Sequence, residues 1–448
     1  MLDRELIRSL SERESAALDE RTPASAAAFG RAKKVLAGGV ASSYQARKPW
    51  PIYLSHGEGQ RVWDVDGNEY FDFHNGFSTM LQGHAHPVIG TAVAERYGRG
   101  THFAAPTEDA VVVAEELARR FGLPRWRFTN SGTESAMGAM RIARAITGRD
   151  DVVKMLGTYH GHYDALMVGV GAGYEQGVPA ATADRVHPID FNDAEALERR
   201  IHELERDARA PACVILEGVM THVGLALPHE GYLEAVREIT RRHGVLLVFD
   251  EVKTGLSIAA GGAVERFGVE PDMVILAKAL GGGLPTGAIG LSAEVGGAAE
   301  ERAVLHFGTF NGNPLGLAST RANLLGVLTP DAYEGLFALN DRLVAGCDAV
   351  IAESGLPGHT VAIGSKGCVF FGSDPVVDYR SFERQRDRGL AELIWLWFMN
   401  RGCYVTPGRG QEWNLGVAHT DEAVERYVDV FGELAAELSP RLSGSARA

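Results

Sequence analysis

Three short apolar runs, each followed by a polar residue, most constrain how this chain folds. The runs cover 212–216, 245–249 and 273–277, and the residues that follow them are Glu217, Asp250 and Lys278. Continuous apolar strands that alternate with helical patterns are typical of a mostly parallel sheet covered on both faces. Ligands bind beyond the carboxyl ends of such strands, so we expect these three side chains to mark a functional edge. The alternative for any one of them is a charged residue that begins a surface loop.

The rest of the chain supports an α/β architecture with more than one part. A hairpin is predicted over 61–73, strands over 125–129 and 151–155, and helices over 106–121, 134–147, 193–207 and 232–243. From about residue 329 the pattern changes to helices with a few strands. We therefore predict a large domain at 76–328, a smaller α+β domain at 329–448, and an N-terminal segment, 1–75, that packs with the small domain.

Charge and composition exclude several classes of function. The 448 residues contain 44 Lys and Arg against 58 Asp and Glu, a net charge of −14, which argues against a nucleic-acid binder. No apolar run is long enough to cross a bilayer, and the first residues lack the apolar core of a signal peptide. The four cysteines form no C-x-x-C pair. We expect a cytoplasmic protein without membrane or nucleic-acid partners.

Glycine is unusually frequent and clusters near the candidate site. The chain has 54 glycines, and a triplet at 281–283 follows Lys278 closely. Another glycine, Gly132, lies in the tract Asn-Ser-Gly-Thr-Glu at 130–134, between a predicted strand and a predicted helix. Exposed N–H groups at a helix N-terminus form a cradle for one phosphate, although a simple helix cap has the same composition.

Together these features fit one cofactor, pyridoxal phosphate. This cofactor needs a lysine for an imine, an acid facing the pyridinium nitrogen, a phosphate cup and a planar group against its ring. Lys278, Asp250 and the 130–134 tract supply the first three. The tract 157–164, which contains Tyr159, offers the aromatic group.

The sequence resembles the class III aminotransferases, a fold-type I pyridoxal-phosphate family that includes glutamate-1-semialdehyde 2,1-aminomutase. The matching motifs follow one another along nearly the whole chain. They are AGGV at 37–40, VWDVDGN at 62–68, GHAHP at 83–87, TNSGTES at 129–135, TGRD at 147–150, TYHGHYD at 158–164, FDEVKTG at 249–255, LAKALGGGLPTGAIG at 276–290, FGTFNGNPLG at 307–316 and AHTDEAV at 418–424.

The resemblance implies roles for the cofactor-binding residues. Lys278 would form the internal aldimine and move the proton, and Asp250 would pair with the pyridine nitrogen. Val252 and Tyr159 would pack on the two faces of the ring. The phosphate would be held by Ser131, Gly132 and Thr133.

The resemblance further implies a homodimer. Gly308 and Thr309 would reach the phosphate of the cofactor in the neighbouring subunit. Glu217 matches an acid near the cofactor and would act through its neighbours.

The departures from the aminomutase pattern concern the substrate. Gln45 stands where the aminomutase has an arginine that receives the substrate carboxylate, and a neutral amide cannot replace a guanidinium. Arg47 or Arg409 could take that role. Phe77 and Gln411 are further candidates for substrate contact.

These departures favour transfer between two molecules, from an amino acid or amine donor to a carbonyl acceptor by ping-pong kinetics. The alternatives are an aminomutase and a non-catalytic protein on the same fold. The pairs His84/His86 and His160/His162 lack matched ligand spacing, so we expect no metal site.

Overall fold

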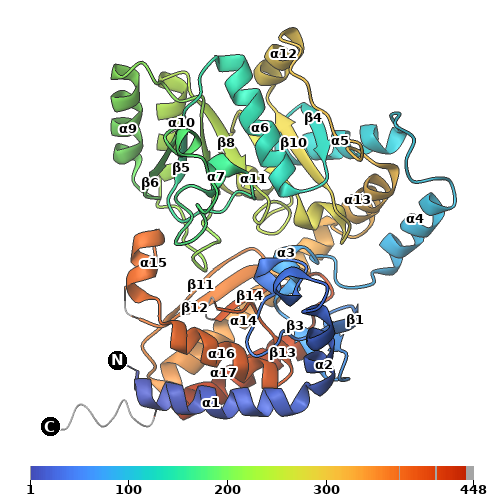
Figure 1. The fold of residues 1–448 in the computed structure, drawn as a ribbon, viewed down its shortest axis with the longest axis vertical. Coiled ribbons are helices and arrows are strands. Elements are labelled where there is room, and N and C mark those ends of the chain that lie inside the picture. Colours follow the sequence, from blue (N-terminus) through green and yellow to red (C-terminus); the bar gives the residue numbers. More distant parts are fainter. Residues whose placement is uncertain (1, 373, 409–410, 440–448) are drawn as a thin grey trace.

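A seven-stranded sheet forms the centre of the large part of the molecule. The computed structural model describes residues 2–372, 374–408 and 411–439 (Figure 1). The strands follow the order β4-β10-β9-β8-β7-β5-β6, and only β10 runs against its neighbours. Their bounds are β4 Arg125–Thr129, β5 Val152–Met155, β6 Val186–Ile189, β7 Cys213–Leu216, β8 Leu246–Asp250, β9 Met273–Leu276 and β10 Gly287–Leu291. The expected strands are confirmed, and β6 and β10 are additions to them.

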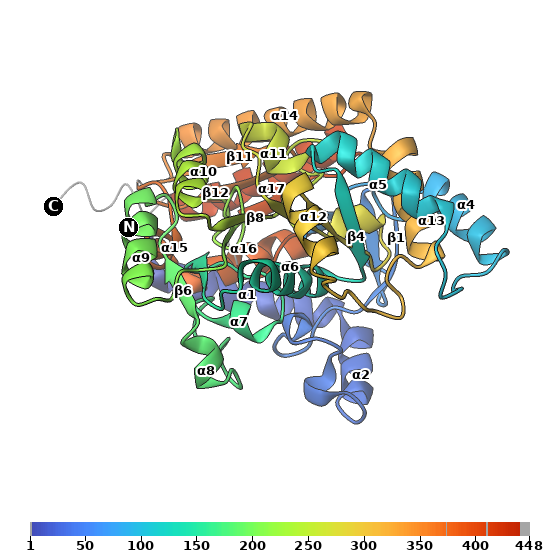
Figure 2. The same cartoon turned by 90° about the horizontal axis from the view of Figure 1, so that it is seen from above.

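Alternate residues of the same strands enter two separate apolar cores, which explains why these strands are apolar throughout. Val214, Leu247 and Val274 join a core with residues of α10 (Tyr232–Arg242). Their chain neighbours Ile215, Val248 and Ile275 join a second core with α6 (Gly132–Thr147). Helices α6 and α10 accordingly lie on opposite faces of the sheet (Figure 2). The predicted doubly covered α/β sheet is confirmed.

Further helices surround these elements. Around the large sheet they are α4 Pro87–Tyr97, α5 Glu108–Phe121, α7 Asp164–Met167, α8 Ala180–Ala183, α9 Ala194–Arg206, α11 Gly262–Phe267, α12 Ala293–Glu301 and α13 Pro314–Gly326. The N-terminal and C-terminal segments contain α1 Arg4–Arg21, α2 Pro23–Ala32, α3 Asn75–Ser78, α14 Pro330–Ser354, α15 Tyr379–Gln385, α16 Arg388–Asn400 and α17 Asp421–Leu438. Short 3₁₀ turns lie at Ala37–Gly39, Ser43–Gln45 and Lys278–Gly281. No described helix has the length and apolar character needed to cross a membrane.

Two smaller sheets contain the strands of the N-terminal and C-terminal segments, and only the first of them combines strands from both. One has the order β1-β2-β3-β13 and the other β11-β12-β14. Their strands are β1 Leu54–Glu58, β2 Arg61–Asp64, β3 Glu69–Asp72, β11 His359–Ile363, β12 Lys366–Phe370, β13 Cys403–Tyr404 and β14 Gln411–Asn414. The predicted hairpin is β2–β3, in which Val62 lies opposite Tyr70, and β13 adds to it in parallel.

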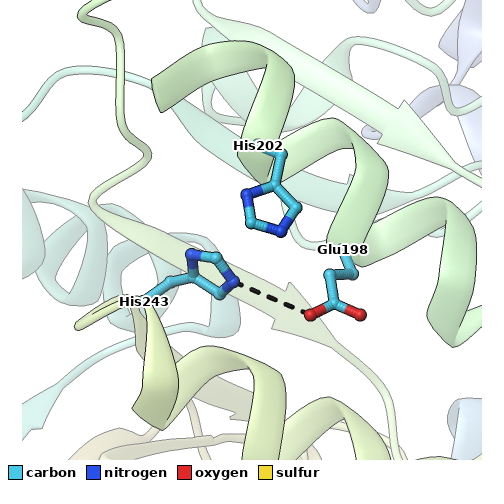
Figure 3. Close-up of side chains that lie close together, drawn as sticks. All are labelled: Glu198, His202 and His243. Carbon is cyan, nitrogen blue, oxygen red and sulfur yellow. Dashed lines mark ion pairs between the residues drawn. The ribbon is translucent and has the colours of Figure 1, made fainter. Parts of the chain in front are cut away.

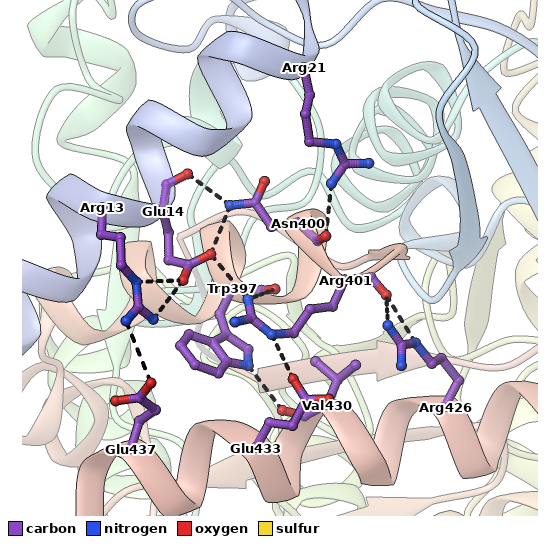
Figure 4. A network of polar contacts seen from close by, with 10 residues as sticks. All are labelled: Arg13, Glu14, Arg21, Trp397, Asn400, Arg401, Arg426, Val430, Glu433 and Glu437. Carbon is purple, nitrogen blue, oxygen red and sulfur yellow. Dashed lines mark hydrogen bonds and ion pairs between the residues drawn. The ribbon is translucent and has the colours of Figure 1, made fainter.

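Helix α1 is fixed to the C-terminal segment through the buried carboxylate of Glu14 (Figure 4). Arg401 donates to Glu14 at 3.0 Å and Asn400 donates to it at 2.8 Å. The guanidinium of Arg401 also stacks on Trp397, 3.4 Å from the ring centroid. Burial opposes ionisation of Glu14, but the hydrogen bonds from Arg401, Asn400 and Arg13 outweigh it and hold its pKa below the usual range.

Candidate active site

A pocket of about 350 Å³ opens at the carboxyl ends of the parallel strands. Seven of the predicted site residues line it together. They are Ser131, Gly132, Thr133, Tyr159, Asp250, Val252 and Lys278. The remaining lining residues are Thr79, Asn130, His160, Gly161, Ala277 and 283–286. The strand-end rule thus locates the pocket, since Asp250 ends β8 and Lys278 follows β9.

One end of the pocket is the N-terminus of α6. Ser131 caps this helix and its hydroxyl accepts from the N–H of Glu134 at 3.2 Å. Gly132 and Thr133 form the first turn, whose N–H groups precede any intrahelical acceptor. A Cβ on Gly132 would lie 3.1 Å from both methyl groups of Val252, so a larger residue would press on that wall. This end suits one anionic group.

Asp250, the acid of the pocket, is buried, and both oxygens of its carboxylate have hydrogen-bond partners. Its Oδ1 accepts from the N–H of Val252 at 2.9 Å, and its Oδ2 lies 2.6 Å from Nδ1 of His160. Because an ionised carboxylate only accepts, Nδ1 of His160 carries the proton of that bond. The carboxylate is thereby held in one direction. The sequence did not assign His160 to the site. It lies 90 positions from Asp250 in the chain, and only the fold brings the two side chains together.

Lys278 begins the 3₁₀ turn after β9 and holds an unusual backbone conformation. Its φ is +51°, a region that residues with a Cβ rarely adopt. Thr286 faces the same pocket, and its buried Oγ1 has no hydrogen-bond partner among the described residues. A strained lysine and an unsatisfied hydroxyl beside a cavity indicate a site built for a ligand.

Two apolar walls complete the pocket. Tyr159 lies between β5 and α7, and its ring stacks near His222 at a centroid distance of 5.7 Å. Burial raises the pKa of Tyr159, which keeps the phenol neutral. Val252 lies two residues beyond Asp250 and lines the same cavity.

Comparison with known proteins identifies the family. The model of the class III aminotransferases matches residues 43–369. This protein belongs to the class III aminotransferases. Among curated proteins, a glutamate-1-semialdehyde 2,1-aminomutase of Thermus thermophilus is 39% identical over 423 residues, which cover 91% of this chain and 98% of that protein.

Solved structures agree with the family and the fold. A glutamate-1-semialdehyde aminomutase from Pseudomonas aeruginosa PAO1 is 32% identical, with a TM-score of 0.91 over 98% of this chain and 99% of that chain. An omega-transaminase from Sphaerobacter thermophilus is 34% identical, with a TM-score of 0.87 over 94% and 99%. The predicted family and the fold-type I architecture are therefore confirmed.

The substrate candidates that the structure describes, Arg47, Phe77 and Gln411, do not line the pocket of this class III aminotransferase. Arg47 stacks on Trp395 of α16, 3.4 Å from the ring centroid, and pairs with Glu392 at 3.0 Å. Phe77 has a φ of +56° and packs edge-on against Tyr44, whereas Thr79 lines the pocket. Gln411 is buried in β14, and Arg409 lies outside the described residues.

A group of buried charged side chains near the pocket was not foreseen from the sequence. Lys253 Nζ donates to the carbonyl of Thr221 at 2.9 Å and lies 3.4 Å from Glu412, so it links the large sheet to β14. Thr221 also donates to Glu217, whose pKa is raised by burial and by the charge of Asp250. Glu217 thus contacts Thr221. It is not among the residues that line the pocket.

A second lysine of this group, Lys366, is fully buried in β12. It donates to Ser78 and, at 2.8 Å, to Asn414. Burial and the charge of Lys253 hold its pKa well below the usual range. The sequence does not predict these contacts, because Lys253 and Lys366, each taken alone, look like ordinary surface lysines.

The segment with Gly308 and Thr309 is exposed and lies outside the pocket lining. Its neighbour Asn311 accepts from Asn130 at 3.0 Å, which places the segment beside the phosphate end. Large apolar side chains of the segment face outward, with 84% of Phe307, 64% of Leu305 and 58% of Phe310 exposed.

Proposed function

We propose that this protein is an aminotransferase that moves an amino group between two separate small molecules in two successive half-reactions. The donor is an amino acid or amine and the acceptor is a keto acid or aldehyde. The cofactor is pyridoxal 5'-phosphate, which supplies a carbonyl carbon for the amine and a ring that withdraws electrons. One observation carries the proposal: Lys278, Asp250, Tyr159 and the α6 N-terminus line one cavity.

The residues of the pocket fit this cofactor. The N–H groups of Gly132 and Thr133 suit the phosphate, and the free Oγ1 of Thr286 offers a further hydrogen bond. Asp250, fixed by His160, would hold a proton on the ring nitrogen by a charge-assisted hydrogen bond. Tyr159 and Val252, which line the same cavity, would exclude water from the ring faces.

Lys278 would perform the proton chemistry. Its amine would hold the cofactor covalently, and when released it would be the base that moves a proton between two carbon atoms. Replacement by alanine removes both roles. We expect Lys278→Ala to lose the visible absorbance of the lysine-linked cofactor and all turnover, while Lys34→Ala, an exposed lysine, retains both. Retention of colour and turnover in Lys278→Ala would contradict the assignment.

Transfer between two molecules is favoured by the residues at the substrate side. Gln45, at the position of the carboxylate-binding arginine of the aminomutase, instead accepts from the N–H of Ser42 at 3.1 Å. Arg47 is engaged with Glu392 and Trp395. The described residues that line the pocket include no arginine.

The experiment separates the two reactions by what one substrate does alone. An amino donor added to purified holoenzyme should remove the cofactor's visible absorbance and release one equivalent of carbonyl product per site. A keto acid or aldehyde should then restore the absorbance. Continuous turnover of glutamate-1-semialdehyde without any added acceptor would instead establish the aminomutase, the candidate favoured by the 39% identity to the Thermus enzyme.

We further propose a homodimer and the three-part division of the chain. Exposed Leu305, Phe307 and Phe310 support the dimer, because apolar side chains gathered on one surface segment are typical of interfaces. Thr309, beside them, would reach the cofactor phosphate of the neighbouring subunit. The boundaries at residues 75 and 328 are supported by the pairing of β3 with β13, which joins the N-terminal segment to the C-terminal part.

A further inference from the structure

Helices α9 and α10 pack against each other at the edge of the large sheet, and three potential metal ligands meet at this contact (Figure 3). Glu198 and His202 are four residues apart on α9, so they lie on the same face of that helix. His243 is the C-cap of α10. One ligand atom from each residue lies within 4.8 Å of the other two. We propose that Glu198, His202 and His243 bind a divalent transition-metal ion of the zinc type.

The buried imidazole of His243 points to a ligand. Its side chain is 7% exposed, and its Nε2 has no hydrogen-bond partner among the described residues. Its other nitrogen, Nδ1, lies 2.8 Å from Oε1 of Glu205. Because an ionised carboxylate only accepts, Nδ1 carries the proton of this bond, and in the neutral imidazole Nε2 then has the lone pair that a metal ion needs. A carboxylate behind one nitrogen and a metal on the other is the usual arrangement of a metal-binding histidine.

The remaining donors face this nitrogen. Oε1 of Glu198 lies 3.9 Å from Nε2 of His243, and the rings of His202 and His243 are 4.6 Å apart at 84°. Glu205 also lies 3.4 Å from Nδ1 of His202, so one acid supports both histidines. Tetrahedral zinc with bonds of about 2.0–2.1 Å needs donor atoms about 3.3 Å apart. From the 4.8 Å that bounds the present separations, a shift of about 1.5 Å brings the donors to this spacing, and the side chain of His202 is exposed on the surface of α9.

The charges around the cluster favour a cation, with one competitor. Glu198 and Glu205 are acidic, and the C-terminal end of α10 carries the negative end of the helix dipole. Arg242 donates to Oε1 of Glu198 and also to Glu238, at 3.2 Å. Arg242 occupies the same Oε1 that faces His243, so the ion would displace Arg242 from this oxygen or bind through Oε2, and Arg242 would keep Glu238 as its partner. Nitrogen donors select zinc-like ions over magnesium.

This site is distinct from the proposed active site, since none of its residues lines the cofactor pocket. Its effect is to clamp α9 onto the C-terminal end of α10. From the sequence we expected no metal site, because the only histidines considered were the pairs at 84/86 and 160/162. The new ligands come from two helices and form no local motif.

The test measures Zn²⁺ binding to tag-free, cofactor-loaded protein after treatment with a chelator. Isothermal titration calorimetry should find one Zn²⁺ per chain, and Zn²⁺ should raise the melting temperature whereas Mg²⁺ should not. Co²⁺ in place of Zn²⁺ should give the visible bands of a tetrahedral site. We expect His243→Gln and His202→Gln each to weaken binding at least tenfold and to remove the shift in melting temperature.

His229→Gln, an exposed histidine outside the cluster, is the matched control and should bind Zn²⁺ as the wild type does. Unchanged cofactor absorbance in all variants shows that they are folded, so a loss of zinc binding is specific to the site. Equal Zn²⁺ affinity of wild type and both cluster variants would overturn the proposal. Failure of the wild type to bind Zn²⁺ in the micromolar range would overturn it as well.

Discussion

At the scale of single residues, the sequence identified the side chains that end strands but not those that act across the fold. Lys278 and Asp250 could be predicted because each follows an apolar run, and the topology then brings them to one edge. His160 and Thr286 could not be predicted, because no local sequence pattern shows what a histidine or threonine in a loop contacts. Arg47 shows the opposite case, since its charge suggested a substrate contact while it stacks on Trp395.

Asp250→Asn tests the central electrostatic contact. The variant keeps the shape of the side chain but loses the charge that, in the proposed function, would hold a proton on the ring nitrogen. We expect kcat to fall by about 10²-fold or more, the usual cost of losing a preorganised charge in a dry site. Steady-state kinetics measures this, with Asp164→Asn as the control at a position outside the pocket lining. A fall of less than threefold would contradict the role of Asp250.

Glu251, the next residue, predicts a dependence of stability on pH. Burial, aided by the charge of Asp250, raises its pKa to about 7, although Thr254 and the N–H groups of Ala263 and Val264 oppose the shift. The folded protein therefore binds a proton that the unfolded chain releases near pH 4.5. This contribution is full below about pH 4.5 and is lost as the pH rises to about 7.

Glu251→Gln mimics the protonated side chain, because the amide oxygen can still accept from Ala263 and Val264. We expect equal free energies of unfolding near pH 4.5 and a variant more stable than the wild type by about 3 kcal/mol above pH 7. Urea unfolding across this range measures the difference, and exposed Glu230→Gln should follow the wild type. A constant difference between wild type and Glu251→Gln would refute the shifted pKa.

At the scale of elements, apolar runs predicted the parallel strands β7, β8 and β9, but β6 was not predicted and the glycines of β10 concealed that strand. Gly287 and Gly290 lie where a Cβ would come within 2.3 Å of Thr129 and 2.6 Å of Trp126 on neighbouring β4. The tract therefore reads as a loop, although close packing is what its glycines permit. The strands β7, β8 and β9 needed no such exception, and their bounds differ from the prediction by one residue at each changed end.

Lys154 on β5 anchors the segment that carries Tyr159 and His160. Its fully buried Nζ donates to the carbonyls of Thr158 at 2.8 Å and of Leu166 and Val168 at 2.9 Å. Burial lowers its pKa to about 7, against the opposing charges of nearby acids. The ammonium group of Lys154 thus fixes the loop after β5 by three hydrogen bonds to backbone carbonyls.

Lys154→Met should therefore destabilise the protein by about 3 kcal/mol or more, because three buried carbonyls lose their donor. We also expect weaker cofactor binding, since Tyr159 and His160 lose their support. Urea unfolding and cofactor titration measure the two effects, with exposed Lys34→Met as the control. Wild-type stability in Lys154→Met would show that these carbonyls find other partners.

At the scale of the whole molecule, the sequence signalled the change of pattern near residue 329 but not how the chain ends meet. The pairing of β3 with β13 and the contacts of Glu14 with Asn400 and Arg401 join segments more than 300 residues apart. Such contacts carry no local signal. The exposed apolar segment at 305–310 is a similar case, because only the proposed second subunit would bury its side chains.

The double variant Phe307→Ser/Phe310→Ser tests the dimer. Each ring gains about 1.5–3 kcal/mol on burial, so their loss should weaken dimerisation by at least a hundredfold. Light scattering on a sizing column should find a dimeric wild type and a largely monomeric variant, whereas Val65→Ser, which alters an exposed apolar residue in the hairpin turn, should remain a dimer. Because Thr309 would no longer reach the neighbouring phosphate, cofactor affinity should fall together with dimerisation. A monomeric wild type that binds the cofactor fully would refute the shared phosphate site.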